Sequence, residues 1–392
     1  MSGPRVLHLQ YANPASYPPL EHAARILAGR GARVRFLGVH VAEVSALRFA
    51  ERDGVEVRLL PECPPGPRQK LHYLWFAAWA LWHVLRWRPD AVYVSDVTAA
   101  PAGLLVQRVA GVPVVYHEHD APSAALGRRR WGRVCLDARG LLAGRAAMVV
   151  VPNAERARLL AGESGGAPAV HVAWNCPERA EAARPRAAAD GPLRLVFHGS
   201  IVPERLPLAV LDAMARAGSP VELSVAGYEP AGARGYCDAL RARAAELGMA
   251  ERVRFAGPVR HRADLLRLCA EHDAGFALMP AVSDDVNLRW MAGASNKPFD
   301  YLACGVCPIV SDLPEWRLAF VEPGYALACD PADADSIAAA LRWAAAHRPE
   351  LRAMAEAGRR RVLEDWNYEH QFRPVADVLC AAPARRRAEA GA

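Results

Sequence analysis

The sequence predicts an α/β protein with two doubly wound parallel sheets, and three observations lead to this prediction. In the first half, short apolar runs rich in β-branched residues alternate with longer helical patterns, which is typical of parallel strands joined by crossover helices. A polar segment rich in Ala and Pro, residues 177–192, interrupts this alternation, which then resumes. A chain of 392 residues is also long enough for two domains of comparable size.

Seven runs in the first half are predicted to be strands: RVLHLQ, ARVRFLG, VEVRLL, DAVYVSD, VPVVYHEHD, AMVVVPN and AVHVAWN. Helical patterns separate them, and the one in TAAPAGLLVQRVAG is expected to end at Gly111. We therefore assign residues 1–178 to an N-terminal domain, which lies on the acceptor side in the functional interpretation below.

Six runs in the second half are predicted to be strands: LRLVFHGS, VELSVAG, RVRFAG, DAGFALMP, CPIVSD and YALAC. They define a second domain over residues 193–365, after a linker over 179–192. A last helix, 366–382, is expected to pack back on the first domain, with a solvated tail over 383–392. The two domains are expected to face each other across a cleft, because ligands of open parallel sheets bind at the carboxyl ends of the strands.

Charge and cysteine content narrow the classes of partner and the compartment. The net charge is +6, and arginine supplies nearly all of the positive charge. An arginine-rich composition is also typical of proteins from GC-rich genomes, so the charge by itself does not indicate a polyanion, and we expect no nucleic-acid partner. Cys304 and Cys307 have the spacing of a metal or redox pair, but no second pair accompanies them. The start of the chain has no signal-peptide pattern. The sequence thus predicts a cytoplasmic protein with reduced thiols.

The segment 71–87, LHYLWFAAWALWHVLRW, is the one stretch that suggests a membrane. It is too short and too polar to span a bilayer. One interpretation is a crossover helix that is buried against the sheet. The other is an aromatic helix that lies on a membrane surface with its basic flanks at the lipid headgroups, which would place the protein peripherally on the inner face of the plasma membrane.

Two motifs in the second half are typical of phosphate and sugar binding. In VFHGSIVPERL, a strand is expected to end at His198, Gly199 and Ser200 to form a turn, and Arg205 to lie near a helix start. Such a turn exposes backbone N–H groups, and the helix terminus favours anions. The guanidinium of Arg205 adds a fixed positive charge with several donors for phosphate oxygens.

The second motif is SNKPFDYLACG, in which Ser295 and Asn296 are possible caps of a helix that ends at Gly305. Lys297 lies at the N-terminal end of this helix, and Asp300 lies on its first turn. A basic group for phosphate and a carboxylate for two vicinal hydroxyls, as in a ribose, make a pocket for a nucleoside diphosphate. An ordinary capped helix with a local ion pair remains the alternative interpretation.

These motifs together resemble the donor domain of the GT-B-fold glycosyltransferases, family 4 in particular. In that family a Gly–x–x–x–Pro–Glu–Lys/Arg turn and an Asn–Lys–x–x–Glu–Tyr–x–x–x–Gly helix bind the sugar nucleotide, and this chain has FHGSIVPER and SNKPFDYLACGVCPIVSD. The first half is similar too, through VYVSDVTAAPAGLLVQRVAGVPVVYHEHDAP, VVVPNAERARLL and VAWNCPE. The resemblance covers residues 4–380 and implies the GT-B architecture, with two Rossmann-like domains.

The resemblance also implies the roles of individual residues. Arg205 and Lys297 would neutralise the diphosphate, and His119 matches the family's histidine near the anomeric carbon of the donor. These three are the predicted catalytic residues. The predicted donor-binding residues are Gly199, Ser200, Arg205, Asn296, Lys297 and Asp300, where Asp300 would accept the ribose hydroxyls.

The chain departs from the family at three places. Ala292 stands where the family often has the first of two acids, so Asp284 or Asp285 on the preceding loop is a candidate substitute. YANPASYPP stands where many members have Gly-Gly after the first strand, and Ser200 replaces a frequent Arg. The candidate acceptor or sugar contacts are Asn13, Ser16, Tyr17, Asp96, Asp120, Asp284 and Asp285.

No metal or other cofactor is expected. His117, Glu118, His119 and Asp120 are consecutive, and side chains alternate along a strand, so the four are not expected to converge on one ion. Two cations and a helix terminus would supply the positive charge that a diphosphate leaving group needs.

The expected function is a metal-independent glycosyltransferase that moves a sugar from a nucleoside-diphosphate sugar to an unknown acceptor, a glycan, a lipid-linked sugar or a small molecule. The family analogy implies retention of the anomeric configuration. The alternatives are a GT-B-fold nucleotide-sugar epimerase and a non-catalytic subunit that binds sugar nucleotides. A nicotinamide dehydrogenase would need Gly-x-Gly-x-x-Gly after a first strand, and neither HLQYANPAS nor FHGSIVPER supplies it.

Overall fold

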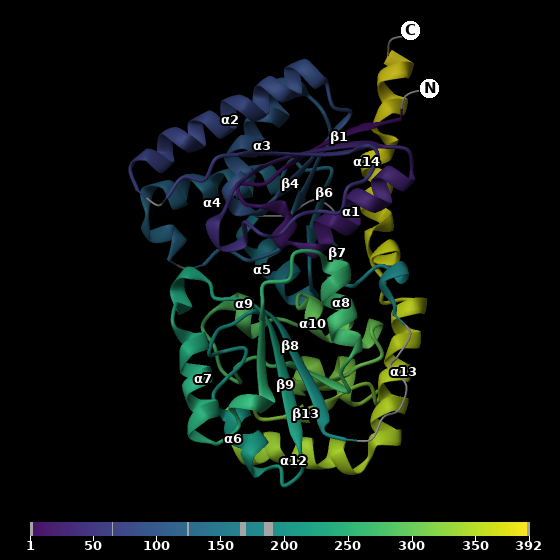
Figure 1. Cartoon of the computed structure of the whole chain (residues 1–392). Helices are drawn as coiled ribbons and strands as arrows, with labels where there is room; N and C mark the ends of the chain where they lie inside the picture. The colour runs from purple at the N-terminus through teal and green to yellow at the C-terminus, as the bar shows by residue number, and fades with distance from the viewer. Residues whose placement is uncertain (1–2, 65, 124, 165–169, 184–190, 390–392) are drawn as a thin grey trace. The chain divides into compact units, whose positions relative to one another are not determined.

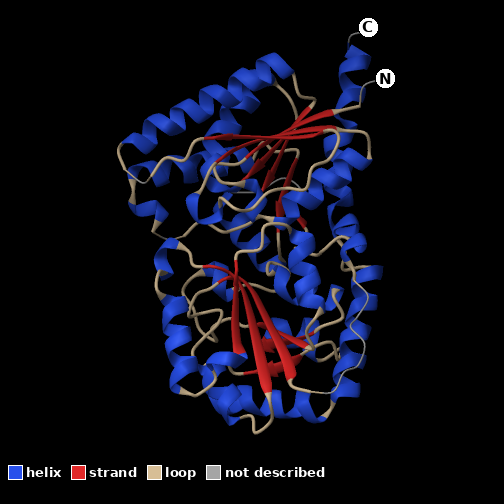
Figure 2. Ribbon diagram, viewed as in Figure 1, coloured by secondary structure: helices blue, strands red, loops and turns tan. Residues whose placement is uncertain are grey.

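The structure is a computed structural model that describes residues 3–64, 66–123, 125–164, 170–183 and 191–389. It confirms the predicted α/β class. In this part of the chain thirteen strands form two all-parallel sheets, one in each of two compact units (Figures 1 and 2). The N-terminal unit holds residues 1–45, 49–174 and 368–392, and the C-terminal unit holds residues 46–48 and 175–367.

The sheet of the N-terminal unit has the order β3-β2-β1-β4-β5-β6-β7. Its strands are β1 (Arg5–Leu9), β2 (Arg33–Val39), β3 (Val55–Leu60), β4 (Ala91–Ser95), β5 (Val114–His117), β6 (Met148–Val151) and β7 (Val170–Val172). The chain winds outward in both directions from β1 and β4, so the order reverses between these two strands. The crevice at such a reversal is the usual ligand site of a doubly wound sheet.

Alternate residues of these strands enter two different hydrophobic cores. Val6 faces a core that is completed by α1 (Pro18–Gly29) and α14 (Tyr368–Glu389). Leu7 faces the other core, which is completed by α2 (Arg68–Trp87), α3 (Asp96–Ala110), α4 (Arg130–Ala143) and α5 (Ala154–Ser164). Burial on both faces explains why the strands are apolar runs in the sequence.

The sheet of the C-terminal unit has the corresponding order β10-β9-β8-β11-β12-β13 and reverses between β8 and β11. Its strands are β8 (Leu193–Ser200), β9 (Val221–Tyr228), β10 (Val253–Gly257), β11 (Ala274–Ala277), β12 (Cys307–Ser311) and β13 (Leu327–Cys329). One face is covered by α6 (Ala209–Arg216), α7 (Tyr236–Glu246) and α12 (Ala334–Ala346).

The other face of this sheet carries α8 (Arg262–Ala270) and α10 (Asn296–Ala303), with α13 (Arg348–Glu364) packed along α10. Glycines make this packing close. A Cβ at Gly275 of β11 would lie 2.7 Å from the Tyr301 ring, and one at Gly358 would lie 2.4 Å from Leu302. The short helices α9 (Val286–Arg289) and α11 (Pro314–Trp316) lie in the connections.

The predicted helix ends at Gly111 and Gly305 agree with the structure, where both glycines have a positive φ directly after or near the last helical turn. Two predicted boundaries differ. The last helix continues to Glu389, through Ala, Arg and Glu residues that favour helix. The first part of the predicted linker, Arg179–Glu181, is a helical turn of the C-terminal unit, while residues 184–190 lie outside the described residues.

Candidate functional site

The predicted phosphate-binding residues of the C-terminal unit lie at the carboxyl edge of its sheet, but the local structure differs from the prediction. Gly199 and Ser200 do not form a turn. They continue β8, where they pair with Gly227 and Tyr228 of β9. The turn comes later, over residues 203–206, and α6 begins only at Ala209. Arg205 therefore lies in a turn four residues before the helix, and its charge, not a helix terminus, is available to an anion.

Lys297 lies in the first turn of α10 and is buried, with 6% of its surface exposed. Its ammonium lies 5.3 Å from the centre of the Phe197 ring. A Cβ at Gly199, where φ is +106°, would lie 3.4 Å from Nζ, so this glycine leaves room for the lysine. Burial and, to a smaller extent, the neighbouring charge of Arg205 together lower the pKa of Lys297 to about 7, against the opposing charge of Asp300.

Arg205 and Lys297 form the cation pair of this site. The Nε of Arg205 is buried and has no hydrogen-bond partner among the described residues. No carboxylate within the same described part of the chain lies within ion-pair distance of either side chain. The charge of Asp300 acts on Lys297 in the opposite sense to that of Arg205, but Asp300 is itself paired with Arg262. The two neighbouring cations therefore favour an anionic ligand with more than one negative charge.

Asp300 is paired inside the protein. Its side chain is fully buried, and both carboxylate oxygens accept hydrogen bonds from Arg262 at the start of α8, at 2.6 and 3.1 Å. Arg262 also donates two hydrogen bonds to Glu181, at 2.8 and 3.0 Å. Burial opposes the charge of Arg262, but the two carboxylates hold its pKa well above the usual value. The ribose contact predicted for Asp300 stays a prediction.

Sequence reasoning missed Arg262, Glu181, His198 and Asn175. Burial, with the charges of Lys297 and Arg262, lowers the pKa of His198 well below its usual value, so its 3.5 Å contact with Asp300 is between a neutral ring and a carboxylate. Asn175 donates to the carbonyls of residues 293 and 294 through its backbone and side-chain N–H groups and so holds the loop before α10. None of these residues has a local sequence signal, because each acts through a partner far away in the chain.

The remaining predicted donor residues are spread along this edge. Ser200 and Asn296 are half-buried, and the hydroxyl of Ser200 lies 3.5 Å from that of Tyr228. Ala292 lies in the loop before α10. Asp284 and Asp285 are exposed, and Asp285 accepts a hydrogen bond from the backbone of Asn287 as the cap of α9. These geometries do not bring either aspartate to the cation pair.

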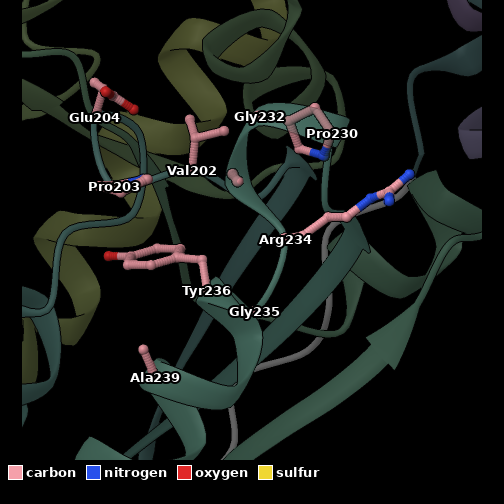
Figure 3. A pocket seen from close by; sticks show the side chains of 10 residues that line it. Val202, Pro203, Glu204, Pro230, Gly232, Arg234, Gly235, Tyr236 and Ala239 are labelled. Atoms are coloured by element: carbon pink, nitrogen blue, oxygen red, sulfur yellow. The ribbon is translucent and has the colours of Figure 1, made fainter.

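A pocket of about 520 Å³ opens between the loops that follow β8 and β9 (Figure 3). The hydroxyl of Tyr236 on its wall donates a hydrogen bond to the carbonyl of Leu206 at 2.7 Å and so fixes the turn that contains Arg205. The lining residues are Val202, Pro203, Glu204, Pro230, Gly232, Ala233, Arg234, Gly235, Tyr236 and Ala239. The lining residue Glu204 directly precedes Arg205. The pocket therefore lies at the carboxyl edge of the sheet, where the sequence predicted ligand binding.

In the N-terminal unit, Asp96 organises the strand ends at the reversal of the sheet. It is a non-glycine residue with φ of +66°, directly after β4, and its side chain is buried. One carboxylate oxygen accepts from the backbone N–H groups of His119 and Asp120, at 2.8 and 3.4 Å, and the other accepts from the amide of Gln10 at 3.1 Å. The strained backbone and these bonds indicate a positioning residue.

His119 is held from several sides and is neutral. Its carbonyl accepts a hydrogen bond from Arg156 at 2.6 Å, and its Nε2 lies 3.3 Å from the hydroxyl of Ser95. Burial lowers the pKa of His119 to about 3, with Arg156 acting in the same direction. Its Nδ1 is buried and has no hydrogen-bond partner among the described residues. The ring is therefore suited to hydrogen bonding with a ligand and not to carrying a positive charge.

The other predicted acceptor residues divide into two groups. Tyr17 lies with its ring centre 5.3 Å from that of His119, and Asp120 is exposed next to it. Asn13, by contrast, uses its side chain within the protein: it accepts from the backbone of Ala15 and donates to the carbonyl of Val44. Ser16 donates to the carbonyl of Asn13. Tyr17, Asp96, His119 and Asp120 thus come together, and the last three are linked by hydrogen bonds.

The four consecutive residues considered for a metal have separate partners. His117 bonds to Tyr93, Glu118 forms a buried ion pair with Arg139, and His119 lies beside Ser95. Within the described residues no group of three or more His, Cys, Asp or Glu side chains is arranged to hold a metal ion. Metal independence stays a prediction.

We expect Asp96→Asn to stabilise the protein in alkaline solution. Burial, reinforced by Asp120, raises the pKa of Asp96 to about 7, against about 3.9 for an ordinary Asp. Ionisation therefore costs stability as the pH rises from about 4 to about 7, with the full cost above that range. Asparagine removes this cost, so the variant should be more stable by about 1–3 kcal/mol near pH 8 and nearly unchanged near pH 4. Urea unfolding at both pH values measures this, with the exposed Asp137→Asn as control. Equal shifts at both pH values would contradict it.

Two protein-family models match the chain. Residues 19–177 match the family model of the glycosyl transferase 4-like domain, and residues 208–377 match that of a glycosyl transferase-like domain. No curated protein sequence matches the chain.

Solved structures share the fold over nearly the whole chain. HepE from Anabaena, solved with UDP-glucose, is 17% identical with a TM-score of 0.70, covering 96% of this chain and 99% of that one. Sucrose-phosphate synthase from Thermosynechococcus elongatus is 15% identical with a TM-score of 0.72 (99% and 100%). A putative UDP-N-acetylglucosamine 2-epimerase from Listeria monocytogenes is 14% identical with a TM-score of 0.61 (98% and 97%).

Proposed function

Because this chain belongs to the glycosyltransferases of the GT-B fold, we propose that it transfers a hexosyl or related glycosyl unit from a nucleoside-diphosphate sugar to an acceptor hydroxyl. The observation that carries the proposal is the cation pair of Arg205 and Lys297 at the carboxyl edge of a doubly wound sheet, in which neither side chain forms an ion pair with a described residue. The relatives of known structure include one that binds UDP-glucose. A nucleoside diphosphate carries the charge that this pair requires.

The proposed reaction breaks the bond between the anomeric carbon and the β-phosphate oxygen and forms a bond to the acceptor oxygen. Negative charge develops on the departing phosphate, where Lys297 and Arg205 stabilise it. We propose retention of configuration by attack from the same face, in which the departing phosphate oxygen accepts the proton of the acceptor hydroxyl. The positive charge of the two side chains supports catalysis without a metal ion.

A ligand panel and a product analysis test this function. Thermal unfolding is measured with nucleoside mono- and diphosphates and nucleotide sugars, each at about 100 times a micromolar dissociation constant, where binding stabilises by about 2.7 kcal/mol. We expect stabilisation by diphosphates and nucleotide sugars, weaker stabilisation by monophosphates, and its loss in Lys297→Met. Failure of every nucleotide to stabilise the protein would overturn the proposal.

The second candidate is a nucleotide-sugar epimerase, because one structural relative is described as such an enzyme. Incubation of the best-binding nucleotide sugar without an acceptor distinguishes the two functions. A transferase releases the free diphosphate only slowly by hydrolysis, whereas an epimerase produces an isomeric nucleotide sugar with the diphosphate still attached. An isomeric product would favour the epimerase.

Diphosphate binding is expected to take up a proton in mildly alkaline solution. The pKa of Lys297 is about 7 without a ligand, and a bound polyanion raises it. Near pH 8, where the nucleotide phosphates are ionised, binding should therefore take up close to one proton per site, and affinity should fall by up to about tenfold per pH unit. Calorimetry in two buffers of different ionisation enthalpy counts the protons. Lys297→Arg keeps the charge without this titration, and equal uptake by that variant would contradict the assignment.

A further inference from the structure

The helix α2 has an apolar face on each side. It is the crossover from β3 to β4, and its inner face is buried through His72, Tyr73, Phe76, Ala80, His83 and Val84, as one of the two sequence interpretations expected. On the opposite side, large apolar side chains are exposed: Leu71 (69%), Leu74 (63%), Trp75 (49%), Trp82 (54%) and Leu85 (59%). Trp79 packs against the core and does not belong to this set.

The exposed side chains follow the helical period. Counted from Leu71, the other four residues lie 3, 4, 11 and 14 positions further along the helix. At about 100° per residue these spacings place all five on one stripe that covers about two-sevenths of the helix circumference. Figure 1 shows α2 along the outside of its unit. We call these five residues the outer stripe. A soluble helix usually carries polar residues on that face, so a stripe of three leucines and two tryptophans indicates a surface that a partner covers.

The charged residues of α2 and of the start of α4 are all basic. Exposed basic side chains lie at both ends of α2, and a second group lies at the start of α4, where the Trp131 ring packs 4.6 Å from the Tyr73 ring of α2. The basic residues are Arg68, Lys70, Arg86, Arg88, Arg128, Arg129, Arg130 and Arg133. The segments 66–88 and 125–134 contain no Asp or Glu.

From this combination we propose that the outer stripe and its basic flanks dock the protein on an anionic membrane surface. Leucine and tryptophan side chains enter the boundary between headgroups and acyl chains, where tryptophan is favoured, and arginines at the flanks bind lipid phosphates. A protein partner would be expected to supply complementary acids, but a lipid surface needs only a uniform basic rim. No helix in the described part of the chain is long and apolar enough to span a bilayer, so the contact is peripheral.

The basic group at the start of α4 follows β5, and the start of α2 follows β3. Both therefore lie at the carboxyl edge of the N-terminal sheet, the edge that carries Asp96 and His119. Docking would bring this edge close to the lipid surface. The proposal concerns the membrane alone and does not depend on the transferase activity.

Vesicle flotation tests the proposal with the full chain. We expect binding to vesicles of phosphatidylcholine with about one-third phosphatidylglycerol and at least tenfold weaker binding to pure phosphatidylcholine. Raising the salt from about 0.1 to about 0.5 M should weaken binding as well, because screening acts on the charge component. No binding to the anionic vesicles, or equal binding to both, would overturn the proposal.

Three variants separate the contributions. The variant Leu74→Ser/Trp75→Ser/Trp82→Ser removes three of the five apolar side chains of the outer stripe. The variant Arg86→Gln/Arg88→Gln removes two positive charges at the end of α2. Each should weaken binding to anionic vesicles at least tenfold. Val282→Ser/Leu318→Ser is the matched control, because it removes exposed apolar residues (88% and 70%) of the C-terminal unit, and it should bind as the parent does. Equal binding by all variants would overturn the proposal.

Two further measurements keep the outcome unambiguous. Circular dichroism should be unchanged in the stripe variant, so lost vesicle binding would not reflect misfolding. Light scattering tests the competing occupant, a second copy of the chain. The parent protein could be a dimer and the stripe variant a monomer, with neither protein binding vesicles. This result would overturn the membrane proposal and identify the outer stripe as a self-association surface.

Discussion

Replacing Lys297 by methionine is expected to lower kcat/KM for glycosyl transfer by about 10²–10³-fold, the usual cost of removing one group that stabilises transition-state charge. Methionine keeps the length of the side chain beside Phe197 and removes only the charge. Arg205→Met should have an effect of similar size, and the double variant should lose less than the product of the two, because both cations bind the same diphosphate. Steady-state rates with a fixed donor measure these effects.

The same change should increase the stability of the ligand-free protein. The pKa of Lys297 falls from its ordinary 10.5 to about 7 on folding, so the buried charge costs stability fully below about pH 7 and progressively less up to about pH 10. Lys297→Met should therefore unfold at a higher urea concentration near pH 6, by about 1–3 kcal/mol. The exposed Arg216→Met, which loses an ion pair with Asp335, serves as the control. A variant with normal turnover, or one that is less stable, would refute the assigned role.

Replacing Arg262 by methionine is expected to destabilise the protein by about 3–5 kcal/mol, because it leaves two buried carboxylates without their partner. Asp300 is fully buried, and Glu181 is nearly so. The loss should be partly recovered in Arg262→Met/Asp300→Asn, since the neutral amide removes one of the unpaired charges. Chemical unfolding at neutral pH gives the three free energies.

The control for Arg262 is an exposed ion pair in the same unit. Arg241 binds Asp238 at the surface, with more than half of each side chain exposed, and Arg241→Met should change the stability by less than about 1 kcal/mol. A cost for Arg262→Met no larger than this would show that the ion pair with Asp300 and Glu181 contributes little to stability.

Local features of the sequence predicted the elements of the fold. The predicted strand runs correspond to all thirteen strands of the described residues. Central strands such as β4 and β12 are buried on both faces and are therefore apolar runs, whereas the edge strands β3 and β10 are partly exposed and carry charged residues. Gly111 and Gly305 marked helix ends because glycine adopts a left-handed backbone without strain. The motifs placed Arg205 and Lys297 in one domain, and the structure brings these two cations close enough to influence each other. Each motif also contains an acid, Glu204 and Asp300, but Asp300 is paired with Arg262 instead of Lys297.

Features that depend on distant parts of the chain were decided only in the tertiary structure. Gly199 and Ser200 became strand instead of turn because β9 supplies pairing partners for them. Asp300 received Arg262, which lies 38 residues earlier, as its partner.

The sequence by itself determined the alternation of strands and helices and the positions of the two cations, because propensity, periodicity and glycine backbone freedom act over a few residues. Only the tertiary structure decided which charges are neutralised and which face of α2 is covered. Ion pairing and burial depend on neighbours that are distant in sequence, and a helix with apolar residues on two sides contains no local information about which side the core will occupy.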